Sequence, residues 1–237
     1  MPFTQVGATN SVSKMQAKSE SREQLGDVSD RVIRHRLVDR LFHWVTAACM
    51  LILLATALLP IFGFKFNWLA PHWIAGLILA AAVLLHAGRA LTTLALRNMS
   101  VGPNELLRAA TAELSNLRGV YASPAPMGKY SVAQKMFHLG MSIIVFVAIG
   151  TGLVMMIGID TPFWEKDAFL ISERMRGFVF VAHGIATLVS ISMIIIHIYF
   201  AIRPEKFYFT RSMINGWISR ADFEKKHDPL LWQEEDA

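Results

Sequence analysis

Six of the eight histidines lie within or beside long apolar stretches, and four of these form two pairs with the same spacing. His72 and His86 are fourteen residues apart, as are His183 and His197. Fourteen residues of α-helix rise about 21 Å and return to within about 40° of the starting face. A histidine inside a membrane is energetically costly and usually marks a functional site. Each helix would therefore present one imidazole near each surface of a hydrocarbon core about 30 Å thick, the arrangement that two stacked b-type haems require.

The composition indicates that membrane-spanning helices carry these histidines. Hydrophobic residues make up 54% of the 237 residues and charged residues only 17%, whereas a soluble domain has about 25% charged residues. Because lipid offers no partner to an unpaired backbone group, we expect helices. The predicted fold is an all-α membrane protein, a four-transmembrane-helix bundle that binds two b haems. Its spans, each reaching the ~20 apolar residues that a crossing needs, are about 41–62, 72–94, 134–158 and 177–202.

The distribution of positive charge predicts the topology. Nineteen of the 23 Lys and Arg residues lie in residues 1–40, residues 89–135 and the segment after Ile202, and four lie in the connections 59–71 and 158–178. The positive-inside rule therefore places both termini and the middle loop in the cytoplasm, for a multi-pass protein of a bacterial inner membrane. The net charge of +5 is explained by this topology, so we expect lipid and no nucleic acid as a partner.

The chain is predicted to have three parts: a cytoplasmic N-terminal tail of residues 1–38, a transmembrane cytochrome b domain of residues 39–203, and a cytoplasmic C-terminal tail of residues 204–237. Between spans two and three, Gly102-Pro103-Asn104-Glu105 predicts the start of a short cytoplasmic amphipathic helix. Its leucines would face either the inner membrane surface or a soluble partner subunit.

Five histidines are candidates for axial ligands. His72 and His183 should lie at one depth near the outer ends of neighbouring helices, and we expect them to bind the outer haem. His197 is expected to bind the inner haem, and both His43 and His86 lie near its depth. The fourteen-residue spacing favours His86 as the second inner ligand.

Other reactive side chains have smaller expected roles. The single cysteine, Cys49, cannot provide an iron–sulfur cluster, an internal disulfide or the motif of a c-type haem, so we expect it to serve packing. His138 is interpreted as an interface residue, with proton transfer to a quinone as the alternative. His35 and His227 lie outside the spans and are assigned no chemistry.

Several motifs resemble the cytochrome b (gamma) subunit of membrane-bound respiratory formate dehydrogenase, within the hydrogenase-type and b561-like dihaem cytochromes b. The resemblance covers about residues 35–233. Its motifs are Asp39-Arg40-x-x-His43-Trp44, His72 with Gly76 and Arg89, Gly128-Lys129-Tyr130, Gln134-Lys135-Met136, His183 with His197-Ile198-Tyr199, and Gly216-x-x-Ser219-Arg220 before Lys225-Lys226-His227-x-Pro229.

The resemblance implies a different inner ligand from the one that spacing favours. It assigns the inner haem to His43 and His197, and we follow it because the motif around His43 is local and complete. His86 would then lie beyond the ligands, near a haem propionate together with Arg89, or be the alternative ligand.

The resemblance also implies a quinone close to the inner haem. Members of this group usually have Asn after Gly-Lys-Tyr, where this chain has Ser131, whose hydroxyl can still bond a quinone carbonyl. The alternative for these residues is a loop that caps the third span. The candidates are Gly128, Lys129, Tyr130, Ser131, Gln134 and Lys135.

The expected function follows from this resemblance. An iron–sulfur subunit would pass electrons from a catalytic subunit with molybdenum or tungsten, and this chain would deliver them to ubiquinone or menaquinone near the cytoplasmic face. The chain would not itself oxidise formate, and the resemblance allows a higher oligomer of the complex. The alternatives are the cytochrome b of a nickel–iron hydrogenase or of another molybdoenzyme, and, more remotely, a non-redox membrane transporter.

Overall fold

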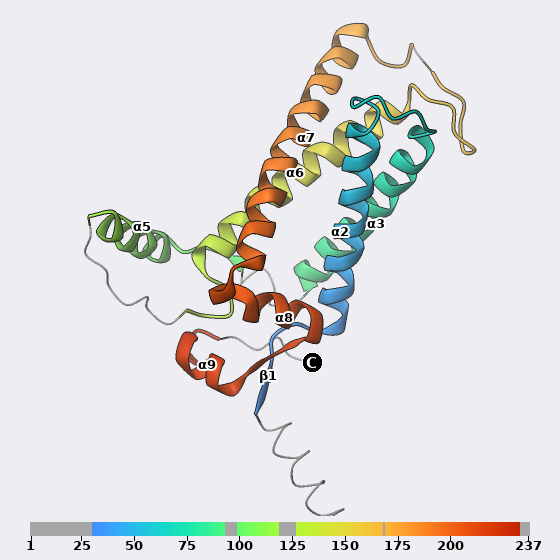
Figure 1. Cartoon of the computed structure of the whole chain (residues 1–237). Helices are drawn as coiled ribbons and strands as arrows, with labels where there is room; N and C mark the ends of the chain where they lie inside the picture. Colours follow the sequence, from blue (N-terminus) through green and yellow to red (C-terminus); the bar gives the residue numbers. More distant parts are fainter. Residues whose placement is uncertain (1–29, 93–98, 119–126, 168, 233–237) are drawn as a thin grey trace, which may run out of the picture.

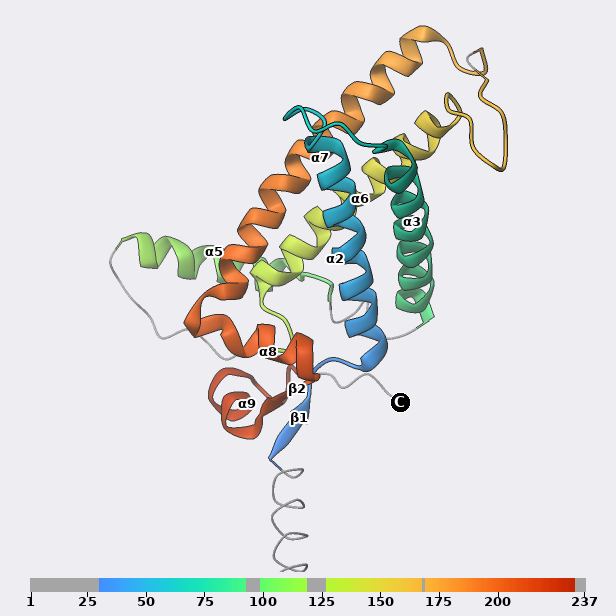
Figure 2. The ribbon, with the colours of Figure 1, turned by 45° about the vertical axis from the view of Figure 1, so that its right-hand side comes forward.

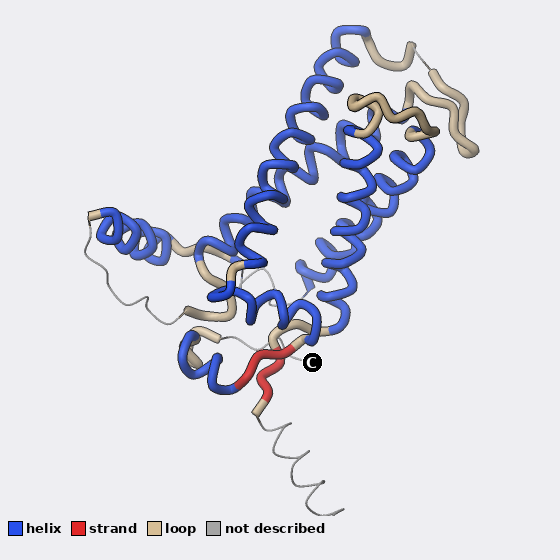
Figure 3. The backbone as a smooth tube through the Cα atoms, viewed as in Figure 1, coloured by secondary structure: helices blue, strands red, loops and turns tan. Residues whose placement is uncertain are grey.

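Four long helices form the body of the protein (Figures 1 and 3). The computed structural model describes residues 30–232, except 93–98, 119–126 and 168. All four helices are long and apolar enough to cross a membrane, which confirms the predicted four-span helical architecture. They are α2 (Leu37–Leu58), α3 (Leu69–Thr92), α6 (Val132–Met156) and α7 (Glu173–Ile202). Each begins two to four residues before the span predicted from hydropathy.

Side-chain caps fix the starts of two of these helices, α6 and α7. The Ser131 hydroxyl accepts a hydrogen bond from the backbone amide of Gln134 at the start of α6, and the Ser172 hydroxyl accepts one from Met175 at the start of α7. Such caps satisfy backbone amides that the first helical turn leaves unpaired. At the other end of α7, Pro204 follows Arg203, and the chain turns into the 3-10 helix η1 (Pro204–Lys206).

The helices pack as two pairs, α2 with α3 and α6 with α7, and α3 joins the pairs by packing against α6. The core between them contains Cys49, Met50, Leu79 and Val145, each less than 9% exposed. Cys49 lies in the packed position that was predicted for it. Large apolar side chains on the outer faces are exposed, as lipid contact requires.

Segments from the N-terminal and C-terminal parts of the described chain fold together beyond the end of the bundle where α2 begins and α7 ends, the inner end in the predicted topology (Figure 2). β1 (Arg31–Ile33) pairs antiparallel with β2 (Trp217–Ser219), with Val32 opposite Ile218. The rest of this inner-end module is α8 (Phe207–Asn215) and α9 (Arg220–Lys226). Gly216, at φ 93°, connects α8 to β2, and an added Cβ there would lie 2.9 Å from a backbone oxygen. The sequence predicted two separate tails, whereas the structure brings residues from both into one module.

The predicted helix between spans two and three is present as α5 (Pro103–Leu117). It extends away from the base of the bundle (Figure 1). Lys135 on α6 holds its first turn, with Nζ 2.9 Å from a carboxylate oxygen of Glu105. Leu106, Leu107 and Leu114 are 47–64% exposed, so the apolar face of α5 is largely uncovered.

Candidate functional site

The outer ends of α3 and α7 bring two histidine rings close together. The ring centroids of His72 and His183 are 6.3 Å apart, with their planes inclined by 69°. The two residues that were predicted to share one depth therefore lie opposite each other.

A threonine from a neighbouring helix bonds each of these rings. Thr56 Oγ1 lies 2.8 Å from Nδ1 of His72, and Thr151 Oγ1 lies 2.9 Å from Nδ1 of His183. Each hydroxyl also donates to a carbonyl of its own helix, at 2.7 Å to Ile52 and 2.6 Å to Val147. Because the hydroxyl proton is used there, the oxygen can only accept a hydrogen bond from a protonated Nδ1. Both rings are thereby held with Nε2 unprotonated and available to bind a metal.

The inner ends of α2 and α7 bring together a second pair. The ring centroids of His43 and His197 are 6.2 Å apart, inclined by 49°, and Phe137 stacks on His197 at 5.4 Å. In the described part of the chain, buried Nδ1 of His43 has no hydrogen-bond partner, and neither does the buried hydroxyl of Thr46. This pair is therefore held mainly by packing, whereas the outer pair has a threonine hydroxyl bonded to each ring.

His86 faces a different neighbour. Its ring stacks on Phe42 at 4.0 Å and lies 6.3 Å from the ring of His138 on α6. Arg89, three residues later, forms an ion pair with Asp39 at 3.2 Å. Of the two candidate partners of His197, His43 thus has its ring 6.2 Å from that of His197, although spacing had favoured His86.

The separation within each pair suits a metal with two axial imidazoles. Two metal–nitrogen bonds of about 2.0–2.1 Å, added to the distances from nitrogen to ring centre, give about 6 Å between centroids. The observed 6.2 and 6.3 Å fit this requirement. The pairs are formed by histidines alone, which suits b-type haem iron and excludes thiolate ligation. At the outer pair, a Cβ on Gly152 would lie 3.4 Å from the ring of His183, so glycine leaves room for that ring.

The Thr56 and Thr151 contacts were not predicted. Threonine in an apolar helix commonly bonds the carbonyl three or four residues earlier, and both residues do so. The available signal was the presence of a hydroxyl within each span at the depth of a histidine, but sequence does not show toward which helix it points.

Three of the six quinone candidates have structural roles. Ser131 and Gln134 form a reciprocal cap, since the Gln134 side-chain oxygen also accepts from the Ser131 amide at 2.9 Å. Lys135 bonds Glu105 and the carbonyl of Ser100. The alternative interpretation of this segment, a loop that caps the third span, therefore accounts for Ser131 and Gln134.

The remaining candidates pack against the inner-end module. The carbonyl of Gly128 lies 2.8 Å from Nδ1 of His227, and a Cβ on Gly128 would lie 2.7 Å from the carbonyl oxygen of Leu231. The carbonyl of Lys129 accepts a hydrogen bond from Arg34 at 2.5 Å. The ring of Tyr130 lies 6.2 Å from that of His35.

Three residues of this module that sequence reasoning passed over are deeply buried. Arg34 is 2% exposed and lies 4.5 Å from the ring of Phe209, and its Nε has no partner among the described residues. Burial lowers the pKa of Arg34 to about 10. Burial, together with the charges of Arg34 and Lys129, lowers the pKa of His35 to about 3. Burial also lowers the pKa of His227.

Comparison with known proteins agrees with the resemblance found in the sequence. Residues 34–216 match the model of the family described as prokaryotic cytochrome b561. The chain is 24% identical over 217 residues to the formate dehydrogenase cytochrome b556 subunit of Haemophilus influenzae, covering 86% of this chain and 84% of that protein. It is 23% identical over 218 residues to the formate dehydrogenase cytochrome b556(fdo) subunit of Escherichia coli K12, covering 86% of this chain and 93% of that protein.

Proposed function

Because this chain belongs to the prokaryotic cytochrome b561 family, we propose that it is the dihaem membrane subunit of a formate dehydrogenase complex and reduces a quinone. Family membership and the four apolar helices establish a multi-pass membrane cytochrome b that binds haem b and transfers electrons. The observation that carries the finer proposal is the presence of two histidine pairs, with separations of 6.2 and 6.3 Å, on one bundle.

We assign His72 and His183 as outer ligands and His43 and His197 as inner ligands. When bound, each haem supplies one-electron chemistry through its iron. The chain's part is to fix the ligand rings and exclude water. Since His183 and His197 are fourteen residues apart on α7, the two sites are separated by about 21 Å along that helix.

The electron donor and the orientation are inferred from the relatives and from charge. Both relatives are named as formate dehydrogenase subunits. We therefore propose that an iron–sulfur subunit contacts the outer end and connects to a molybdenum- or tungsten-containing catalytic subunit. Four crossings would return the chain to its starting side, and the excess of Lys and Arg supports the proposal that this side faces the cytoplasm of a bacterial inner membrane.

The quinone is proposed to bind near the inner pair, beside the loop before α6. This loop contacts the inner-end module through Gly128 and Lys129, and Tyr130 lies next to His35. Lys129 and Tyr130 offer polar side chains there. We expect Ser131, Gln134 and Lys135 to shape the site through the cap of α6 and the tether to α5, and His86 and Arg89 to lie near the inner haem.

Haem stoichiometry tests the ligand assignment. In detergent-purified protein, pyridine haemochrome analysis should give two haems b per chain, one in His72→Ala, one in His43→Ala and two in His86→Ala. The intact outer haem in His43→Ala serves as the folding control. One haem in His86→Ala together with two in His43→Ala would reject the assignment of His43.

The proposed partner requires a separate test. Gentle solubilisation of the native complex, followed by identification of the co-purified subunits, should recover an iron–sulfur protein and a molybdenum or tungsten enzyme. Formate should reduce both haems of this complex and then a soluble quinone analogue. Recovery of a nickel–iron hydrogenase would reject the partner and leave the haem assignment untouched.

A further inference from the structure

One face of α8 carries an arginine between two exposed apolar residues. Phe207, Arg211 and Ile214 are four and three residues apart and so share this face. Phe207 is 54% exposed, Ile214 is 56% exposed, and Arg211 is exposed as well. α8 runs across the inner end of the bundle (Figure 2), where lipid headgroups meet water. A face of this composition suits the membrane interface.

Arg211 shares an indole ring with a second arginine. Its guanidinium carbon lies 5.2 Å from the ring centroid of Trp217, and that of Arg31 lies 4.3 Å from the same centroid. Both arginines are exposed. The strand pairing that joins β1 to β2 brings these cations together from opposite ends of the chain. Two like charges beside one ring repel each other, and an anion between them would remove this repulsion.

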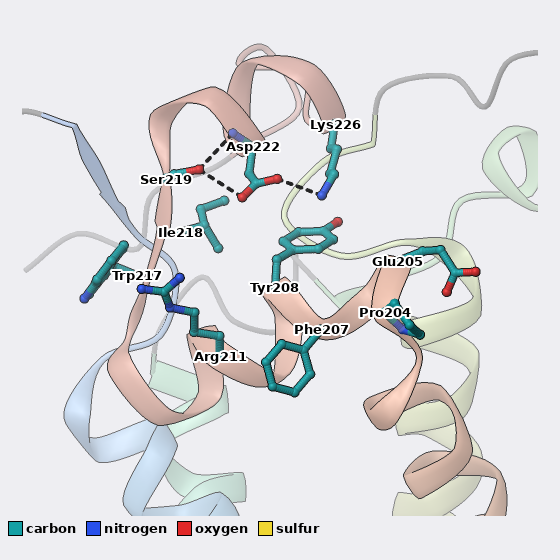
Figure 4. A pocket seen from close by; sticks show the side chains of 10 residues that line it. All are labelled: Pro204, Glu205, Phe207, Tyr208, Arg211, Trp217, Ile218, Ser219, Asp222 and Lys226. Carbon is teal, nitrogen blue, oxygen red and sulfur yellow. Dashed lines mark hydrogen bonds and ion pairs between the residues drawn. The ribbon is translucent and has the colours of Figure 1, made fainter.

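Arg211 and Trp217 also line a pocket of about 370 Å³ between η1, α8, β2 and α9. Figure 4 shows Arg211 extending toward Trp217, while Phe207 projects toward the bundle helices. The other charged residues of the pocket are already in ion pairs. Asp222 lies 2.7 Å from Lys226, and Glu205 lies 2.8 Å from Arg203 outside the pocket. Within the described chain, Arg211 has no carboxylate at ion-pair distance.

We propose that Arg211, Trp217 and Arg31 bind the phosphate of an anionic phospholipid from the inner leaflet. A guanidinium can hold two phosphate oxygens in one plane, which suits a headgroup at a fixed position. The acyl chains would lie against Phe207 and Ile214, and these apolar neighbours favour a lipid over free phosphate. Basic pockets at the cytoplasmic side of membrane helices commonly bind such headgroups. This proposal does not depend on the partner enzyme or on the quinone.

The test compares lipid binding by wild type, Arg211→Gln and Arg174→Gln. Arg174 is an exposed arginine in the first turn of α7, at the opposite end of the bundle, and provides the matched control. Each haem-loaded protein is titrated in neutral detergent with fluorescent short-chain phosphatidylglycerol or phosphatidylcholine. Wild type and Arg174→Gln should prefer phosphatidylglycerol, and Arg211→Gln should lose about fivefold in its affinity, the effect of one interfacial cation.

Two further measurements separate the possible outcomes. Arg211→Lys keeps the charge without the planar fork, so its affinity should lie between those of wild type and Arg211→Gln. Inorganic phosphate should compete only weakly. Complete displacement of the lipid by phosphate at low millimolar concentration would overturn the lipid assignment. Equal affinities in wild type and Arg211→Gln, with unchanged haem spectra, would overturn the site itself.

Discussion

The two proposed haem sites have almost the same separation between ligand rings but differ in what holds the rings. At the outer site, Thr56 and Thr151 accept hydrogen bonds from the Nδ1 atoms of His72 and His183. At the inner site, Nδ1 of His43 is buried and has no hydrogen-bond partner among the described residues. Hydrogen bonds fix the tautomer and rotation of the outer ligands and raise their basicity. The inner ligands depend on packing against aromatic neighbours, so we expect the inner site to respond more to changes in the surrounding module.

The largest effect expected from this comparison is loss of one whole haem. His183→Ala should remove the outer haem and His197→Ala the inner haem, because each residue would supply one of the two protein ligands proposed for its haem. A redox titration followed in the visible spectrum should then resolve a single haem in each variant, with a different midpoint potential. Loss of both haems in either variant would show that the sites are not independent.

A smaller effect is expected from the threonines. Thr56→Val removes the acceptor of the His72 Nδ1 proton and should weaken outer haem retention about tenfold to a hundredfold, as for other residues that orient metal ligands. Thr46→Val is the control at the inner end, because the buried hydroxyl of Thr46 has no hydrogen-bond partner in the part of the chain that the structure describes. It should leave haem retention unchanged. Haem transfer to apomyoglobin measures retention, and equal losses in both variants would remove the distinction between the sites.

The inner-end module should lose stability in acid. Unfolded His35 binds a proton below pH about 6.5, whereas folded His35 does so only near pH 3. Between these values the unfolded state binds more protons, so stability falls as the pH falls. His35 should lower the free energy of unfolding by about 2 kcal/mol at pH 5 relative to pH 8, and His227 acts in the same direction.

Thermal unfolding followed by tryptophan fluorescence at both pH values measures this effect. In His35→Gln the difference between pH 5 and pH 8 should be smaller by the contribution of His35. The same pH dependence in this variant and in wild type would assign the acid sensitivity to other groups.

The smallest expected effect is the loss of stability on replacing either of two glycines in left-handed conformations. Gly63 in the outer connection, at φ 90°, has no atom within 4 Å of an added Cβ, whereas Gly216 meets the His35 carbonyl at 2.9 Å. Gly63→Ala should cost about 1 kcal/mol through backbone strain alone. Gly216→Ala adds a steric clash and should cost more, measured by the same unfolding assay. Equal losses of stability in the two variants would show that the structure around Gly216 shifts to accommodate the added Cβ without further cost.

The helices were predictable because length and apolar composition decide whether a segment spans a membrane. The opposition of His72 and His183 also followed from their equal depth near the starts of α3 and α7, which cross the bundle in the same direction. The choice between His43 and His86 did not follow, because both lie near the inner ends of their helices. What distinguishes them is which helix faces α7, and this depends on packing that includes Leu79 and Val145.

The inner-end module was not predictable for a different reason. Its strands have three residues each and lie more than 180 positions apart, so the local sequence of one strand does not identify the other as its partner. The burial of His35 and His227 depends on this pairing and on α8 and α9. Polar composition had indicated tails, but aromatic residues such as Phe209 and Trp232 enclose Arg34 there.

The pairing of β1 with β2 also determines when folding of the inner-end module can be completed during synthesis. β1 is among the first described segments to leave the ribosome, yet its partner is made 184 residues later, after all four spans. At about 5–20 residues per second, β1 waits for about ten to forty seconds. The inner-end module can therefore fold only after the last span has been synthesised. Its folding then indicates that translation has passed His197, the last of the proposed haem ligands.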